Sequence, residues 1–208
     1  MSELNKLQNR NVIIHSVCFL LLFTSFNTSC GISQRVLTTY QNETKDTDNP
    51  FRGINGYTSI GTLYFFFAVF NWFAPVVVEI FTPKFSMMLG GLTYALYVTS
   101  FIYPNTSFMY LASAIVGCGA AVIWTAQGVF LTENSNDDNM QRNSGIFWSI
   151  LQCSMIIGNL YIYFKWKGIT TVSSDVRIPL YTIFTALCGA GCFGFLQGEY
   201  CNIECFEF

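Results

Sequence analysis

Charged side chains are scarce in this sequence, because Asp, Glu, Lys and Arg make up only 11% of its 208 residues. A soluble domain carries about 25% charged residues, and a chain this poor in charge does not cover a water-exposed surface. The formal net charge of −2 gives no basic surface for nucleic acid. The composition therefore excludes an ordinary soluble protein and a nucleic-acid-binding protein.

Patterns for catalysis and metal binding are also missing. Histidine occurs once, as His15. The sequence has no Ser/His/Asp set, no carboxylate pair inside an apolar segment and no G-x-x-x-x-G-K-[ST] phosphate loop. Six of the eight cysteines stand in apolar runs, where cysteine packs as a small side chain. A zinc site would need more ligands at suitable spacing than these cysteines and one histidine provide. We expect no enzyme activity, no metal and no cofactor.

Hydrophobic residues take the place of charge, at 52% of the chain, and 21 of them are Phe. They form six apolar segments of about 19–25 residues, each long enough as a helix to cross about 30 Å of hydrocarbon. The expected spans are residues 12–36, 57–81, 85–103, 108–131, 144–166 and 178–196. We predict an all-α membrane protein with six transmembrane helices over 12–196 in a lipid bilayer, an N-terminal segment 1–11 and a tail 197–208.

The first segment follows Lys6 and Arg10, as a cleavable signal peptide would, but its apolar run is too long for one. We interpret it as an uncleaved helix. The distribution of Lys and Arg does not favour a cytoplasmic N-terminus. In contrast, Asn42-Glu43-Thr44 is a glycosylation sequon in the first long loop, and its use places that loop outside. We expect a cytoplasmic N-terminus and glycosylation at Asn42; the plasma membrane and endomembranes both stay open.

Several amide side chains lie inside the expected spans, and the candidates for a cavity lining are Asn27, Gln127, Gln152 and Asn159. Gln152 and Asn159 are seven residues apart and therefore share one helix face. Amides both donate and accept hydrogen bonds, so they suit a cavity for a neutral or zwitterionic solute. The alternative, which the residues alone favour, is hydrogen bonding between helices.

Other features of the spans have structural readings. His15 is interpreted as a structural residue near the membrane interface. Gly117 and Ala121 form a small-xxx-small pair that permits close helix packing. Pro75 predicts a kink in the second span.

Several segments together resemble the UNC-93-like branch of the major facilitator superfamily, over about residues 10–195. The most specific of them are Trp124-Thr125-Ala126-Gln127-Gly128 and Arg142-Asn143-Ser144-Gly145-Ile146-Phe147-Trp148. The resemblance implies two six-helix halves around a central cavity, of which this chain is the N-terminal half in truncated form. It also implies a cytoplasmic N-terminus and a glycosylated first outer loop. The cavity-lining residues that it implies are Asn27, Trp124, Gln127, Gln152 and Asn159.

Two departures from the superfamily pattern bear on function. Segment 79–85 lacks the usual loop signature rich in Gly, Asp and Arg, and the tail 197–208 does not resemble the family. The resemblance implies a solute transporter, present here at half length. The alternative is a non-transporting subunit that regulates or traffics ion channels or receptors, with a potassium channel as one such partner.

Overall fold

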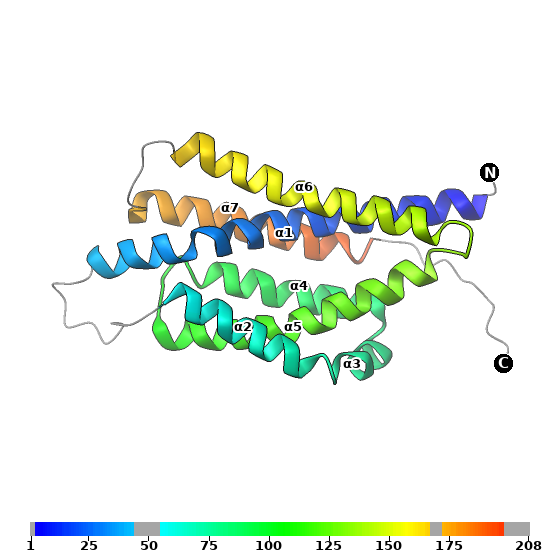
Figure 1. Cartoon of the computed structure of the whole chain (residues 1–208), viewed down its shortest axis with the longest axis horizontal. Coiled ribbons are helices and arrows are strands. Elements are labelled where there is room, and N and C mark those ends of the chain that lie inside the picture. Colours follow the sequence, from blue (N-terminus) through cyan, green and yellow to red (C-terminus); the bar gives the residue numbers. More distant parts are fainter. Residues whose placement is uncertain (1–2, 44–54, 167–171, 198–208) are drawn as a thin grey trace.

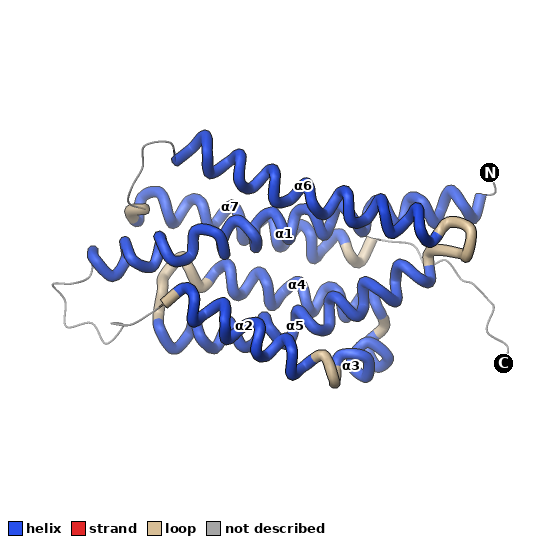
Figure 2. The backbone as a smooth tube through the Cα atoms, in the orientation of Figure 1, coloured by secondary structure: helices blue, strands red, loops and turns tan. Residues whose placement is uncertain are grey.

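The computed structural model describes residues 3–43, 55–166 and 172–197, and it is helical with short connections and no strand in those ranges. The helices are α1 (Glu3–Glu43), α2 (Gly56–Phe70), α3 (Ala74–Phe81), α4 (Pro83–Thr99), α5 (Thr106–Glu133), α6 (Met140–Trp166) and α7 (Ser174–Gly194). Figure 2 shows this all-α composition, which confirms the predicted class. Most of the tail, residues 198–208, lies outside the described residues.

Four of the helices, α1, α5, α6 and α7, are long and apolar enough to cross a membrane. A fifth span results if α2 and α3, which are bent by 72° at a short break, count as one crossing. Helix α4 has only 17 residues. The structure thus supports an integral membrane protein with four to five candidate spans, and the expectation of six is not confirmed.

The break between α2 and α3 interrupts the expected span 57–81. Helix α2 ends at Phe70 and is capped by Asn71, whose side-chain amide donates to the carbonyl of Phe67 at 2.8 Å. Pro75 stands in the first turn of α3, where a proline needs no backbone donor. The predicted kink is therefore a full interruption, and it precedes the proline.

A single residue joins α3 to α4. Thr82 has a φ of 64°, a conformation that costs energy in a β-branched residue. Pro83 begins α4 at once. The two helices are therefore joined by one of the tightest links that the chain offers.

Apart from the short α3, the helices run along the longest axis of the molecule in two groups (Figure 1). Helix α1 packs against α6 and α7, helix α5 packs against α2 and α4, and α4 contacts α7 between the groups. The six expected spans form two sets of three, and each span of the first set has a counterpart in the second. If counterparts are exchanged, the pair α1–α6 becomes α5–α2, the pair α1–α7 becomes α5–α4, and the pair α4–α7 is unchanged. This is the pairing expected of two three-helix repeats related by a twofold axis, as in secondary transporters.

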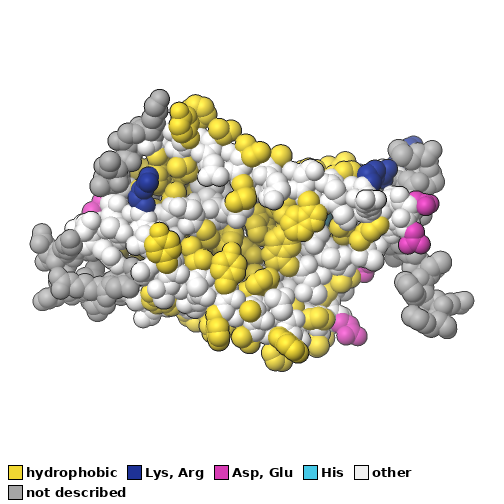
Figure 3. Space-filling model, in the orientation of Figure 1, with side chains coloured by type: hydrophobic (Ala, Val, Ile, Leu, Met, Phe, Trp, Pro, Cys, Tyr) yellow, Lys and Arg dark blue, Asp and Glu magenta, His cyan; other side chains and the backbone are white. Residues whose placement is uncertain are grey.

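Glycine permits the close approach of the helices in two equivalent pairs, α2–α5 and α1–α6. A methyl group at Gly117 of α5 would meet the backbone of Leu63 and Phe67 in α2, and one at Gly158 of α6 would meet the side chain of Thr28 in α1. Ala121, one turn beyond Gly117, is fully buried. The small residues therefore lie where helices touch. Charged side chains appear near the two ends of the molecule, and hydrophobic ones gather across its middle (Figure 3).

Candidate functional site

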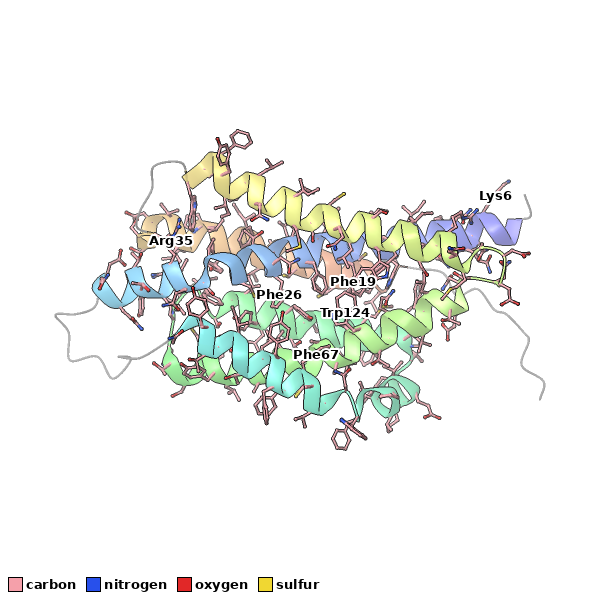
Figure 4. The ribbon with its side chains drawn as sticks, in the orientation of Figure 1. Lys6, Phe19, Phe26, Arg35, Phe67 and Trp124 are labelled. Carbon is pink, nitrogen blue, oxygen red and sulfur yellow. The ribbon has the colours of Figure 1, made fainter. Side chains whose placement is uncertain are left out.

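Aromatic side chains from α1 and α5 meet between the two helix groups. Figure 4 shows Phe19 and Phe26 of α1 close to Trp124 of α5. The Trp124 ring lies 5.6 Å from that of Phe19 and 5.2 Å from that of Phe23, centroid to centroid. Because the main chains of α1 and α5 make few contacts, these rings carry much of the contact between them. We call Phe19, Phe23, Trp124 and Trp148 the aromatic wall.

Trp148 of α6 completes this wall. Its ring stacks on Trp124 with 5.7 Å between centroids and 12° between planes. Trp124 is partly buried, whereas Trp148 is 49% exposed. One side of the stack is therefore open to the surroundings of the bundle, and a bound molecule would have access to it.

The structure distributes the four predicted amides around this wall. Asn27 is half-buried, and its amide donates to Ser154 of α6 at 3.4 Å. Gln127 lies one turn beyond Trp124 on the same face of α5; it is buried, and no hydrogen bond of its side chain occurs among the described residues. Asn27 thus links α1 to α6, whereas Gln127 is a buried amide with unused hydrogen-bonding capacity.

Gln152 and Asn159 are both exposed on α6. They share the helix face of Trp148, because residues four and eleven positions apart lie close in angle on an α-helix. They therefore border the open side that Trp148 marks. The assignment of Asn27, Trp124, Gln127, Gln152 and Asn159 to a cavity stays a prediction.

His15, expected near the membrane interface as a structural residue, is buried inside the bundle. It is 3% exposed, and its ring contacts those of four phenylalanines. These are Phe19, Phe130, Phe147 and Phe195. Neither ring nitrogen has a hydrogen-bond partner in the described ranges. The sequence analysis did not predict this cluster of phenylalanine rings around His15. The spacing of His15, Phe19 and Phe23 along α1 does indicate one packed helix face.

A polar cluster closes one end of the bundle. Asn11 near the start of α1 donates to Asn134 at 2.8 Å, and Arg142 donates to Asn9 at 2.6 Å. Asn143 is fully buried and donates to Ser135 at 2.9 Å. Two residues of the Arg142–Trp148 segment thus hold the α5–α6 connection, and Asn11 and Asn9 tie it to α1.

A separate groove of about 480 Å³ lies between α2, α3, α4 and α5. Its lining includes Phe66, Val77, Thr93 and Cys118, and none of the predicted cavity residues borders it. The only hydroxyl in the lining, that of Thr93, donates to the Gly90 carbonyl at 2.6 Å. The groove offers no polar recognition, and lipid chains would fill it in a bilayer. We therefore take the aromatic wall and Gln127 as the candidate site.

The described residues contain no group of three His, Cys, Asp or Glu that could hold a metal ion. The Asp and Glu residues of these ranges stand at or near helix ends and in loops. What the site offers is aromatic surface and amide groups, which bind through stacking, apolar contact and hydrogen bonds.

The chain is similar in sequence to known proteins of one family. A family model described as "Ion channel regulatory protein UNC-93" matches residues 49–199. UNC93-like protein MFSD11 of Xenopus laevis is 40% identical over 177 residues, which is 85% of this chain and 38% of the relative. UNC93-like protein 3 of Arabidopsis thaliana is 31% identical over 165 residues, covering 74% of this chain and 32% of the relative.

Protein unc-93 homolog A of Bos taurus is 30% identical over 162 residues, covering 73% of this chain and 33% of the relative. The matches thus span less than two fifths of the length of these curated relatives. No solved structure matches the chain. The match of the family model to most of the sequence, together with the membrane-type helices, shows that this chain belongs to the UNC-93 family of membrane proteins.

Proposed function

We propose that this chain is a six-span, half-length transporter of the major facilitator type, whose pathway runs along the aromatic wall and Gln127. In this proposal α2 and α3 form one broken span and α4 forms another. Helix α4 packs beside α5 and α7, and its 17 residues rise about 25 Å, near the lower limit for crossing a bilayer.

The observation that carries this proposal is the combination of an open tryptophan stack with a buried, unbonded amide on the next turn. Stacked rings supply apolar contact, and the Gln127 amide supplies a donor and an acceptor group that no other described residue occupies. Substrate sites of transporters built from inverted repeats lie at repeat interfaces. The pairing of helices here has that repeat pattern, which supports a transporter. The amide groups support a neutral or zwitterionic solute as the substrate class.

The topology completes the proposal. A cytoplasmic N-terminus places the end of α1, with the exposed Asn42, on the outer side, where the sequon is accessible to glycosylation. The other half of the pathway would come from a second half of the kind that a longer relative has room for, or from another chain. Fold likeness does not establish transport, so transport itself is the quantity to test.

Osmotic swelling of liposomes tests the proposal with the full 208-residue chain. Vesicles with and without protein are mixed with glycerol, glucose or alanine, and light scattering reports solute entry. We expect faster entry of at least one solute with the wild-type chain, and loss of the increase in Gln127→Ala. The matched control is Gln141→Ala, an exposed residue at the start of α6. Rates equal to empty liposomes for all three solutes contradict transport of this solute class.

The second candidate function is regulation of an ion channel. Two observations favour it: the family description names ion channel regulation, and the carboxylates of the described ranges lie away from the middle of the bundle, where proton-coupled transport would need one. In this case the chain should co-purify with a potassium channel expressed in the same cells and change its current. Gln127→Ala should leave both effects intact, because no solute pathway is involved.

A further inference from the structure

One arginine is buried without a counter-ion among the described residues. Arg177, in the first turn of α7, is 3% exposed. Its Nε and Nη1 atoms have no hydrogen-bond partner among the described residues. Asp175, two residues earlier, is exposed, and so is Glu43 at the end of α1. No described carboxylate therefore neutralises this guanidinium group.

The neighbours of Arg177 leave further hydrogen-bonding capacity unused. Tyr181 lies one turn along α7 and interacts electrostatically with Arg177. The hydroxyl of Ser29 in α1 lies beside that of Tyr181, and both hydroxyls are buried with no other partner among the described residues. The Arg177 guanidinium and this pair of hydroxyls thus have no acceptor from any other described residue.

This region is held in place by its surroundings. The Tyr181 ring stacks on Phe101 with 5.1 Å between centroids and 7° between planes. The Arg177 guanidinium lies over the ring of Tyr40 at 4.7 Å, and the backbone N–H of Val172 donates to Thr39 at 3.2 Å. The end of α1 is therefore fixed beside the start of α7, as Figure 1 shows.

Binding of an anion would stabilise the buried Arg177 guanidinium. A buried cation without a partner is costly, and one cation–π contact does not offset the loss of its hydration. The start of α7 adds the partial positive charge of a helix N-terminus, and Ser173 makes no side-chain cap there. A guanidinium group together with hydroxyl donors matches the several oxygens of a phosphate-class oxyanion better than a single-atom ion.

We propose that Arg177, Tyr181 and Ser29 bind a phosphate-class oxyanion at the end of the bundle where α1 ends and α7 begins. The oxyanion comes either from the headgroup of an anionic lipid or from free phosphate. The site lies apart from the aromatic wall, so it is independent of the proposed solute pathway.

Thermal unfolding of the full chain in lipid nanodiscs tests the site. The first comparison uses phosphatidylcholine nanodiscs with inorganic phosphate or with sodium chloride at the same ionic strength. The second uses nanodiscs with or without phosphatidylglycerol and no free phosphate. A ligand that binds only the folded state raises the Tm with its concentration. We expect a saturable rise of several degrees in at least one comparison, and the comparison that shows it identifies the source.

Variants separate binding from general salt effects. Arg177→Gln should lose the saturable rise, and Tyr181→Phe should reduce it while the stack on Phe101 is kept. Arg35→Gln removes an exposed arginine at the same end of the bundle (Figure 4) and should respond like the wild type. Where Arg177→Gln does not fold, Tyr181→Phe decides. A wild-type Tm that is unchanged in both comparisons, or an undiminished rise in the variants, overturns the proposal.

Discussion

The indole rings of Trp124 and Trp148 stack with 5.7 Å between their centroids, although the residues belong to different helices that touch little elsewhere. Two indoles this close and this nearly parallel couple their electronic transitions. We expect an exciton couplet in the circular dichroism spectrum of the folded protein. Trp148→Phe should abolish it and, through the weakened ring pair, cost about 0.5–1.5 kcal/mol.

The control for this prediction is Trp72→Phe, because Trp72 is 85% exposed at the α2–α3 break. The couplet should survive in that variant. A spectrum that is the same in Trp148→Phe as in the wild type would show that the stack is not formed in the membrane.

Helix packing at Gly117 predicts a second outcome. Gly117→Ala should destabilise the protein by about 1–3 kcal/mol, because the added methyl meets the α2 backbone and the helices must separate. For a chain of this size 1 kcal/mol corresponds to a Tm change of about 2–4 °C. Gly128→Ala is the matched control in the same helix, where a methyl has no atom within 4 Å. It should be neutral or stabilising by up to about 1 kcal/mol.

Asn143 provides a third prediction, concerning the polar cluster. Asn143→Ala removes the amide that donates to Ser135 and to the buried oxygens of Asn134 and Asn139, and it should cost about 1–3 kcal/mol, because buried acceptors are left unsatisfied. The loss is measured as a lower Tm in detergent. Asn159→Ala, at an exposed position of α6, should leave the Tm unchanged. Equal effects in the two variants would indicate that the α5–α6 connection does not depend on this amide.

Glycosylation at Asn42 gives a fourth test. Asn42 is exposed in the last turn of α1. Protein from eukaryotic cells should run above its 23.5 kDa mass, and glycosidase treatment should restore that mass. Asn42→Gln should remove the shift, whereas Asn105→Gln should retain it, because Asn105 caps α5 through a bond from the Phe108 amide and lies close to the expected span. An unmodified wild-type chain contradicts an outer location for this end of α1.

Part of the candidate site was accessible to sequence reasoning. The segment with Trp124 and Gln127 pointed to α5, and the seven-residue spacing of Gln152 and Asn159 predicted one helix face. The stack of Trp124 on Trp148 was not accessible, because a helical pattern orients a side chain about its own axis and says nothing about which neighbour it meets. The burial of Arg177 was not accessible either, because a charged residue at a helix start usually faces solvent.

The second span shows a further limit. Hydrophobicity alone made residues 57–81 one continuous segment, and Pro75 suggested a kink within it. The structure instead ends α2 at Phe70 and begins α3 at Ala74, beside the proline. Asn71 caps the last turn of α2, and a proline is tolerated best in a first turn. The number of crossings therefore depends on three-dimensional path as well as on composition.

By itself, the sequence determined the medium and the class of structure. Long apolar runs separated by polar breaks are stable only as helices in hydrocarbon, where each backbone amide is satisfied within its own segment, and this condition is local. The tertiary structure decided which helices pair, that Asn27 reaches Ser154 and that Arg177 loses its water. Those contacts join residues far apart in the chain, so they follow from the packing of whole helices, which no local pattern encodes.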